Sequence, residues 1–405
     1  MSLESGPLSK LRVVEGSAFV AAPLGGLTLA QLGAEVIRFD QIGGGLDFHR
    51  WPLTQDKQSL FWAGLNRGKK SVQVDLKSTE GRELISNLIT SPGANAGIFI
   101  TNLAAKGELS YEELCKKRPD LIMVMLTGNY DGSTEVDYTV HPSFGYPLIT
   151  GPSGSAVPVN SVLPTWDLLL GNMVAIAVLV AIEKRRETGT GDLIRIALSD
   201  VALSVVGALG RLSQAHLDTE ESAADGNYLY GAFGTNFTTS DNSQIMLVGL
   251  THRQWESIKS ALNLGAALRA LEMRETVNFD DESQRYIFRR EIAGIIEPII
   301  RGMSLSQVST VFEEFKVAWS KYQTFKDLLK NDPRASSKNP IFHIKNQAGI
   351  GDIPNIASPI RFTATENIAP QTAPTLGEHT SQVLQEILGL SPSQIDVLKN
   401  NKTIA

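Results

Sequence analysis

The first 130 residues alternate between short apolar runs and amphipathic segments, which limits the chain to few folds. Short buried strands are expected at residues 11–14, 34–39, 71–76, 97–103 and 121–128. Apolar residues at helical spacing predict helices between them, at residues 23–32, 79–89 and 110–117. This alternation predicts an α/β domain with a Rossmann-like, mostly parallel sheet. Its ligands should bind at the carboxyl ends of the strands.

The character of the sequence changes after residue 217. A stretch rich in Gly, Asn, Thr, Asp and Ser precedes an apolar strand at 244–250 and an amphipathic helix at 252–263. Residues 339–377 contain five Pro and predict an extended return segment, followed by a helix from Thr380 to Leu388. We therefore expect a large domain over residues 1–217, a smaller α+β domain over 218–330, and a return to the large domain over 331–405.

Composition excludes several classes of protein. The net charge of −6 leaves no broad basic surface, so nucleic acid is not an expected partner. The single cysteine, Cys115, excludes an internal disulfide and a thiolate metal cluster, and the six His show no metal-ligand spacing, so no metal is expected. The N-terminus lacks the apolar region of a signal peptide, which predicts a cytoplasmic protein. The most apolar run, Leu168 to Ile182, has 15 residues, too few to span a membrane.

One carboxylate, Asp167, stands at the mouth of a helix that is otherwise apolar on nearly every face. Pro164 suits the first helical turn and Thr165 can satisfy free amides beside it, so we expect the helix to begin just before Asp167. The positive end of the helix dipole would then hold Asp167 ionised. On this segment alone, a helix-capping acid is favoured over a catalytic one.

Other segments admit two interpretations each. Asn66, Arg67, Lys69 and Lys70 cluster beside a glycine, which suits either a phosphate site or a solvated turn. The glycine-rich segment 226–237 suits a mobile lid or a plain interdomain loop. The glycines at 43–45 lack the spacing of a dinucleotide fingerprint, so a nicotinamide cofactor is not expected. No P-loop, nucleophile elbow or H-E-x-x-H motif is present.

Five long segments follow one another in a specific order: LRVVEGSAFVAAPLGGLTLAQLGAEVIRFDQIGGG, FWAGLNRGKKSVQVDLKSTEGRELI, TNLAAKGELSYEEL, DLIMVMLTG and PTWDLLLGNMVAIAVLVAIEKRRETGTGDLIRIAL. In this order they resemble the class III CoA-transferases, the CaiB/BaiF family, over nearly the whole chain. The resemblance implies that Asp167 is the nucleophile, which overturns the capping interpretation. The wording of IGGGLDFHRWP, TEVDYTV and GNYLYGAFG is most similar to members that move CoA between the two carboxyl groups of one diacid.

The resemblance also implies which residues contact CoA, which enters as part of the substrate while no cofactor is bound permanently. These residues are Phe19, Val20, Arg38, Leu65, Asn66, Arg67, Lys69, Asn102 and Leu103. Many members have N-F-R-P where this chain has Thr101 to Ala104, with Lys106 as the substitute cation. The family further implies an interlocked homodimer.

Residues for the rest of the substrate are chosen from segments distinctive of the diacid-isomerising members. The expected partners of the free carboxylate are His49, Arg50, Tyr138 and His141. Tyr228 and Tyr230 are expected to enclose the site, and backbone amides near Phe19 or in the glycine-rich segment to stabilise the oxyanion.

Three alternatives remain open at this point. An intermolecular CoA-transferase would use every residue named above. An acyl-CoA racemase commonly needs a His before an Asp, where this chain has Val136 before Asp137. A non-catalytic CoA-binding protein has no use for a carboxylate at the helix mouth.

Overall fold

The computed structural model describes residues 6–218 and 222–405, which divide into two compact units. Unit 1 comprises residues 1–144, 161–219 and 333–405, and unit 2 comprises residues 145–160 and 220–332. Residues 145–160 thus cluster with the smaller unit, although the sequence placed them in the large N-terminal domain. The first five residues, on which the expectation about export partly rests, lie outside the described residues, as do residues 219–221 at the start of the expected small domain.

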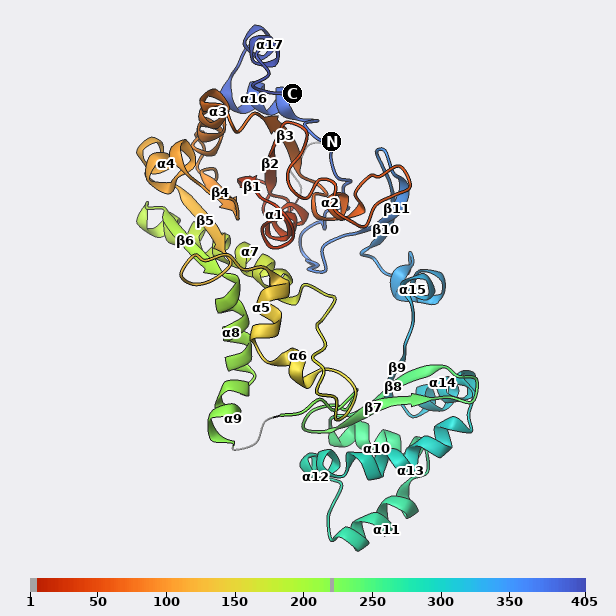
Figure 1. Cartoon of the computed structure of the whole chain (residues 1–405). Coiled ribbons are helices and arrows are strands. Elements are labelled where there is room, and N and C mark those ends of the chain that lie inside the picture. Colours follow the sequence, from red (N-terminus) through yellow and green to blue (C-terminus); the bar gives the residue numbers. More distant parts are fainter. Residues whose placement is uncertain (1–5, 219–221) are drawn as a thin grey trace. The chain divides into compact units, whose positions relative to one another are not determined.

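Unit 1 is built on a six-stranded parallel sheet with the order β3-β2-β1-β4-β5-β6 (Figure 1). The strands are β1 (Arg12–Gly16), β2 (Glu35–Gln41), β3 (Lys70–Val74), β4 (Ile98–Thr101), β5 (Ile122–Thr127) and β6 (Asp192–Ala197). This order confirms the predicted Rossmann-like α/β class. It reverses between β1 and β4, and ligands of such sheets bind outside the carboxyl ends of strands at this reversal.

Helices and short connections complete unit 1. They are α1 (Ala21–Gln31), α2 (Leu60–Leu65), α3 (Thr79–Ile89), η1 (Gly107–Leu109), α4 (Tyr111–Lys117), α5 (Asp137–Ser143), α7 (Thr165–Thr188), α8 (Leu198–Ala208), α9 (Arg211–Leu217), α16 (Thr380–Leu388) and α17 (Pro392–Asn400). The C-terminal helices contribute Val383, Leu384 and Ile395 to the same buried cluster as Val14 and Ile37. The sequence did not predict α17, which follows α16 after the αL turn at Gly389.

Two glycines let α1 and α7 cross at close range. A Cβ atom at Gly25 would lie 2.6 Å from Val174, and one at Gly171 would lie 2.9 Å from the Ala21 carbonyl oxygen. Both approaches are shorter than real Cβ contacts, so larger residues would push the helices apart. The crossing brings the first turns of α7 against the start of α1, at the carboxyl end of β1.

The helix α7 has 24 residues, so the expected run of 15 apolar residues is part of a longer helix. Among the described helices it is the one that is long and apolar enough to cross a membrane. The core helix of a globular protein can have the same length and composition, and 44% of the most apolar 18 residues of α7 are buried within the structure. One face of α7 packs closely against α1, while Ile176 and Val180 are exposed.

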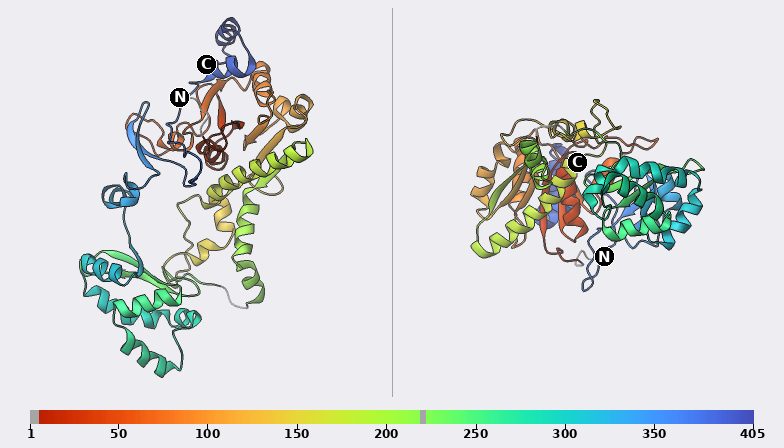
Figure 2. Two further views of the ribbon diagram at one scale, coloured as in Figure 1. Left: turned by 180° about the vertical axis from the view of Figure 1, so that it is seen from behind. Right: turned by 90° about the horizontal axis from the view of Figure 1, so that it is seen from below.

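Unit 2 has an antiparallel sheet of β7 (Phe233–Thr238), β8 (Gln244–Gly249) and β9 (Ala318–Lys321), in this order. Its helices are α6 (Tyr146–Ile149), α10 (His252–Ala261), α11 (Gly265–Glu275), α12 (Glu282–Ile287), α13 (Arg289–Arg301), α14 (Leu305–Glu314) and α15 (Phe325–Asn331). Helices α10 to α14, coloured green to cyan, gather beside the small sheet (Figure 2). They enclose a core around Phe233, Trp255 and Phe312. The smaller α+β fold is thereby confirmed.

The return segment is less extended than the sequence predicts. After η2 (Pro333–Ala335), residues 342–356 form an antiparallel hairpin of β10 (Phe342–Gln347) and β11 (Gly351–Ile356). The sequence did not predict this hairpin, because the segment contains Pro and Pro usually marks a break in a strand. Pro354 lies in the two-stranded sheet, where each strand has one free edge.

Candidate active site

Asp167 lies in the first turn of α7, as expected, and lines a cavity of about 650 Å³ within unit 1. The cavity lies where α1 and α7 begin and where β5 ends. Its polar and charged lining residues are Arg50, Asn102, Thr127, Glu135, Asp137, Tyr138 and Asp167. Its apolar wall includes Phe19, Val20, Trp51, Phe61, Val162 and Leu170. Asp167 itself is half-buried.

The cap of α7 comes from Asp137, a residue that the sequence analysis did not assign to the site. One oxygen of Asp137 accepts hydrogen bonds from the backbone N–H groups of Trp166 at 2.8 Å and of Asp167 at 3.0 Å. Thr165, the expected cap, instead donates its hydroxyl to the Leu163 carbonyl at 3.2 Å. Because Asp137 is buried and starts α5, the position of the helix mouth depends on a contact between two elements.

The pKa of Asp167 is raised from its ordinary value to about 7, first by burial and next by the negative charge of Asp137. The charge of Arg50 opposes this rise. Burial therefore opposes the expectation that the helix dipole holds Asp167 ionised. The first amides of α7 donate to Asp137, while the Asp167 carboxyl group extends into the cavity.

The loop between β1 and α1 enters the cavity with a strained backbone at Phe19, whose φ is 66°. Asn102 clamps this loop, because its side chain accepts from the Ala18 N–H at 2.9 Å and donates to the Ala18 carbonyl at 2.8 Å. The Phe19 N–H donates to Asp47 at 3.1 Å. The amide of Phe19 is thus engaged, and the next two residues, Val20 and Ala21 at the start of α1, also line the cavity.

Arg38 and Lys69 were expected to contact CoA, but both are buried in ion pairs. Arg38 binds Asp40 at 2.9 Å and Asp47 at 2.7 Å, and Lys69 binds Glu15 at 2.8 Å. Burial lowers the pKa of Lys69 to about 8, against the opposing charge of Glu15. Neither cation has an exposed side chain in the structure, so the expected phosphate contact stays a prediction. Arg38 thus links β2 to the loop that contains Asp47, and Lys69 links the start of β3 to Glu15 of β1.

The remaining expected CoA contacts lie at the end of α2 and in a second cavity. Asn66 is buried and accepts from Arg38 at 3.2 Å, while Arg67 is half-buried and donates to Asn355 at 3.0 Å. Leu65 is the last residue of α2. Leu103 lines a second cavity of unit 1, with a volume of about 420 Å³.

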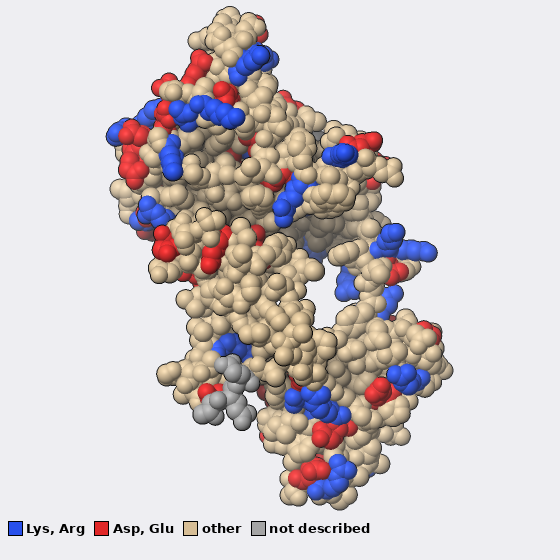
Figure 3. Space-filling view, viewed as in Figure 1, with Lys and Arg blue, Asp and Glu red and all other residues tan. Residues whose placement is uncertain are grey.

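Two cations line this second cavity, which lies beside the carboxyl end of β4. Arg82 is paired with Glu108 at 2.8 Å. Lys106 is exposed, and the described residues offer it no ion pair. On the face shown in Figure 3, Lys and Arg are interspersed with Asp and Glu.

Of the four expected partners of the free carboxylate, two line the cavity and two do not. Arg50 and Tyr138 line the Asp167 cavity, whereas His49 and His141 do not. His49 is exposed and packs edge-on against Phe48, with ring centroids 4.8 Å apart. His141 is buried, and its Nε2 accepts from the Ser161 N–H at 3.3 Å.

Tyr228 and Tyr230 belong to unit 2, so their expected role in enclosing the site stays a prediction. The guanidinium groups of Arg290 and Arg289 lie 5.3 and 5.7 Å from the ring centre of Tyr228. Asp225 pairs with both arginines. Tyr228 is thus held in place, whereas Tyr230 is largely exposed.

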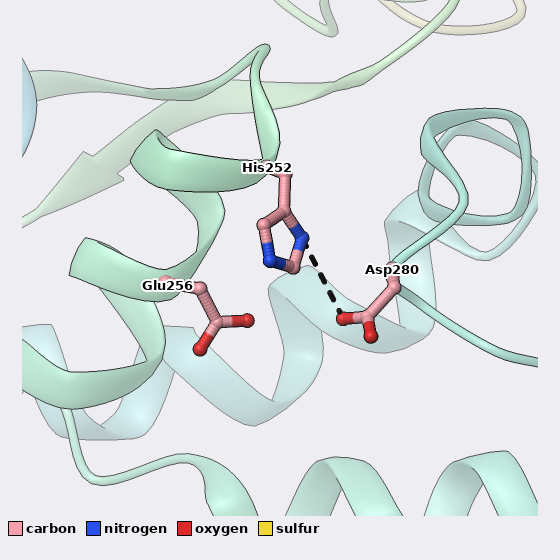
Figure 4. Close-up of side chains that lie close together, drawn as sticks. All are labelled: His252, Glu256 and Asp280. Atoms are coloured by element: carbon pink, nitrogen blue, oxygen red, sulfur yellow. Dashed lines mark ion pairs between the residues drawn. The ribbon is translucent and has the colours of Figure 1, made fainter.

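Unit 2 also brings together a set of side chains that could ligate a metal, which the spacing of the His residues did not indicate. They are His252, Glu256 and Asp280, whose ligand atoms lie within 4.8 Å of one another (Figure 4). Lys259 pairs with Glu256 and lies 3.6 Å from Asp280. Because this ammonium group already pairs with both carboxylates, the cluster is better described as a surface ion-pair network.

Sequence reasoning missed Asp137 as a functional residue, as well as Asn102 as the clamp of the Ala18 peptide. Asp137 precedes Tyr138 in the segment that was compared with a racemase motif, and this was the one available signal. Its distance of 30 residues from Asp167 gave no local reason to connect the two.

Comparison with known proteins agrees with this geometry. The model of the family described as CoA-transferase family III matches residues 8–380. The chain is 49% identical over 401 residues to 2-methylfumaryl-CoA isomerase of Chloroflexus aurantiacus, covering 99% of this chain and 98% of that protein. It is 25% identical to succinyl-CoA–D-citramalate CoA-transferase of the same organism, covering 98% of each. The crystal structure of a CaiB/BaiF family protein from Brucella suis has the same fold, with a TM-score of 0.75 and 24% identity over 94% of this chain and 99% of that one.

Proposed function

Because the chain belongs to CoA-transferase family III, we propose that it moves CoA from the C1 to the C4 carboxyl group of 2-methylfumaryl-CoA (mesaconyl-CoA), with Asp167 as the covalent carrier. The position of Asp167 carries this proposal. A half-buried carboxyl group at the mouth of α7 opens into a cavity within unit 1. The identity of 49% to the Chloroflexus isomerase over the full length supports the choice of substrate.

The first half-reaction moves CoA onto the protein. A carboxylate oxygen of Asp167 attacks the thioester carbonyl, so a C–O bond forms, the C–S bond breaks, and a mixed anhydride and CoA thiolate result. The thiolate then attacks the Asp167 acyl carbon of the anhydride, and the C–O bond to the diacid breaks. Asp167 becomes an aspartyl-CoA thioester, and the free methylfumarate dianion remains in the cavity.

The second half-reaction returns CoA to the diacid. Attack by the C1 carboxylate regenerates the starting thioester, whereas attack by the C4 carboxylate gives the isomer, 3-methylfumaryl-CoA. The two carboxyl groups are trans across the double bond, so they cannot close directly into a five-membered cyclic anhydride. A carrier such as Asp167 is needed for the transfer to avoid hydrolysis.

Local groups suit the charges that develop in these steps. Each tetrahedral intermediate places an oxyanion in the cavity, and the N–H groups of Val20 and Ala21, residues that line the cavity at the start of α1, are its proposed donors. With its pKa raised to about 7, Asp167 is ionised in a substantial fraction of molecules at neutral pH. A raised pKa also makes its carboxylate more basic, and hence more nucleophilic, than an exposed aspartate.

The second cavity, of about 420 Å³, is the proposed seat for part of the CoA moiety. Leu103 and the exposed cation Lys106 line this cavity, and both belong to the segment that the family resemblance assigns to CoA binding. Lys106 then replaces the arginine of the N-F-R-P sequence and meets a phosphate group. No permanently bound cofactor enters the reaction.

The setting of the reaction is part of the same proposal. We infer a cytoplasmic enzyme, because the substrate is an acyl-CoA. The interlocked homodimer that the family resemblance implies is the proposed assembly. Its interface would use exposed apolar residues of unit 1 such as Ile176, Val180 and Leu209.

An intermolecular CoA-transferase is the alternative, favoured by the likeness of 25% to succinyl-CoA–D-citramalate CoA-transferase. An acyl-CoA racemase is less well supported, because Val136 stands before Asp137 where that reaction commonly uses a His. Both alternatives predict a different requirement for co-substrates or a different product.

The deciding experiment incubates the protein with mesaconyl-C1-CoA and no added acid, and follows the product by NMR. We expect the C4 isomer to appear, and Asp167→Asn to abolish its formation. Turnover that begins only when a second acid is supplied would favour the intermolecular transferase. A change of configuration at a carbon next to the thioester would favour the racemase.

A further inference from the structure

We infer that Arg50 binds the carboxylate that is not carrying CoA, and that this contact makes the enzyme selective for dicarboxylic acyl-CoA esters. The inference rests on the proposed function and deepens it. Of the described residues that line the Asp167 cavity, Arg50 alone carries a positive charge. The same cavity is lined by the acids Glu135, Asp137 and Asp167, which repel a second anion, so Arg50 is the charged lining group that attracts it.

The guanidinium group of Arg50 is positioned by aromatic rings and is not paired with an acid among the described residues. It lies 5.4 Å from the ring centre of Phe19 and 5.3 Å from that of Phe61. Within the described part of the chain, its side chain makes no ion pair with any carboxylate. Aromatic faces hold a guanidinium without using its five N–H donors, so these remain available for a bidentate contact with a carboxylate.

The backbone of Arg50 is fixed from both sides. Its N–H donates to the Asp47 carbonyl at 3.1 Å, and its carbonyl accepts from the Ser59 hydroxyl at 2.6 Å. The Asp47 side chain also accepts from the Phe19 N–H at 3.1 Å. Arg50 is an exposed residue that also lines the cavity, and one buried residue, Asp47, fixes both the backbone of Arg50 and the Phe19 loop.

The chemistry of the intermediate gives Arg50 a specific task. Once CoA is on Asp167, the diacid has two carboxylates, of which one attacks and the other must be held. Because the cavity lining offers one cation, the diacid exchanges its two ends at Arg50 between the half-reactions. Arg50 pairs with the C4 carboxylate when the C1 thioester is cleaved, and with the C1 carboxylate when the C4 thioester forms.

The test compares mesaconyl-C1-CoA with 2-methylcrotonyl-CoA of the same trans geometry, in which a methyl group replaces the free carboxylate. Acylation of Asp167 is trapped with hydroxylamine and measured by peptide mass analysis. We expect the wild-type protein to prefer the mesaconyl ester by roughly 100-fold or more in kcat/KM. Arg50→Gln should lose most of this factor on mesaconyl-CoA while changing little on the methylcrotonyl ester, and Arg50→Lys should retain part of it.

Arg253→Gln, at an exposed arginine of α10, is the matched control and should leave both esters unchanged. An equal loss on both esters in Arg50→Gln, or a wild-type protein without preference, would overturn the inference. Binding of the two CoA esters is also measured for the Asp167→Asn variant and for the double variant Asp167→Asn/Arg50→Gln. This measurement needs no turnover. If Asp167 is never acylated, the proposed function fails. The inference about Arg50 is then tested by the binding measurement alone, which shows whether the arginine favours the mesaconyl ester.

Discussion

The backbone N–H of Asp167 donates to the side chain of Asp137 at 3.0 Å, so the proposed nucleophile is positioned by a second, buried acid. The same oxygen accepts from the Trp166 N–H at 2.8 Å. Asp137 therefore caps α7, and its charge is also one cause of the raised pKa of Asp167. Capping and charge can be separated by substitution, because an amide oxygen accepts the same two hydrogen bonds without the charge.

We predict that Asp137→Asn keeps the stability of the protein and moves its pH profile. Without the charge of Asp137, the apparent pKa in kcat/KM should fall from about 7 by roughly one unit, while burial keeps it above the ordinary value. The measurement is kcat/KM against pH from 4.5 to 9. Glu135 and Arg50, the other charged groups that line the cavity, stay unchanged in both proteins.

Asp137→Ala is the comparison for the capping role. It removes the acceptor as well as the charge, and should cost roughly 1–2 kcal/mol of unfolding free energy. An unchanged pH profile in Asp137→Asn would show that the charge of Asp137 does not reach the nucleophile.

We predict that Asp167→Asn is more stable than the wild-type protein at pH 8, although it is inactive. The pKa of Asp167 is 3.8 in a model peptide and about 7 in the folded state. Between these values the folded state holds a proton that the unfolded state has lost, so stability falls as pH rises and the full cost is present above pH 7. The substitution should recover roughly 2 kcal/mol at pH 8, since part of the carboxyl group stays in contact with solvent.

Urea unfolding of both proteins at pH 4 and pH 8 measures this difference. At pH 4 the two free energies should nearly coincide, because the carboxyl group is then protonated in the folded state. A difference of the same size at both pH values would point to packing rather than charge.

Lys69→Met should destabilise the protein without acting on CoA directly. The substitution leaves Glu15 buried and unpaired, which costs roughly 3–5 kcal/mol. Adding Glu15→Gln to Lys69→Met should recover part of this loss, as a double-mutant cycle in urea will show. A fold of normal stability with weakened CoA binding would instead support the phosphate contact expected from the sequence.

Lys106→Ala should have the opposite pattern, with weaker CoA binding and unchanged stability. Loss of one charged contact to a phosphate should weaken affinity roughly tenfold. Titrations with CoA and with dephospho-CoA show whether the 3′-phosphate is the group concerned. Lys10→Ala removes another exposed lysine of unit 1 and serves as the control. Equal affinity of Lys106→Ala and the control for both ligands would remove Lys106 from the proposed CoA seat.

The parallel sheet could be predicted because its signal is local. Buried parallel strands are short apolar runs, and the helices between them repeat apolar residues at helical spacing. The hairpin of β10 and β11 gave no such signal, because its strands are half-exposed and include Pro354. Residues 145–160 cluster with unit 2 through contacts such as Gly154 N–H to the Ala224 carbonyl, which no local pattern reveals.

The site shows the same division between local and long-range information. Asp167 was identified by the order of motifs around it, and its helix by local spacing. The ion pairs of Arg38 and Lys69 could not be predicted, because a sequence gives the charge of a residue but not its burial. Their partners, Asp47 and Glu15, lie on other segments of the chain. Asp137 escaped notice for the same reason.

The last prediction separates the isomerase from the intermolecular transferase. With labelled free mesaconate in excess, the CoA ester product of the wild-type protein should carry little label, because the diacid stays enclosed until CoA returns to it. We expect the loop that contains Tyr228 and Tyr230 to provide this enclosure. Tyr230→Ala should then raise both label incorporation and hydrolysis of the aspartyl thioester, while trapping of Asp167 by hydroxylamine stays near the wild-type level.

Tyr228→Ala should act more strongly than Tyr230→Ala, because it also removes the ring on which Arg289 and Arg290 pack. Tyr322→Ala, at another exposed tyrosine of unit 2, is the control and should retain the label-free product. Free exchange of external mesaconate in the wild-type protein would mean that the diacid leaves between the half-reactions. Asp167 would then still carry CoA, but the enzyme would be an intermolecular transferase that accepts mesaconate from solution.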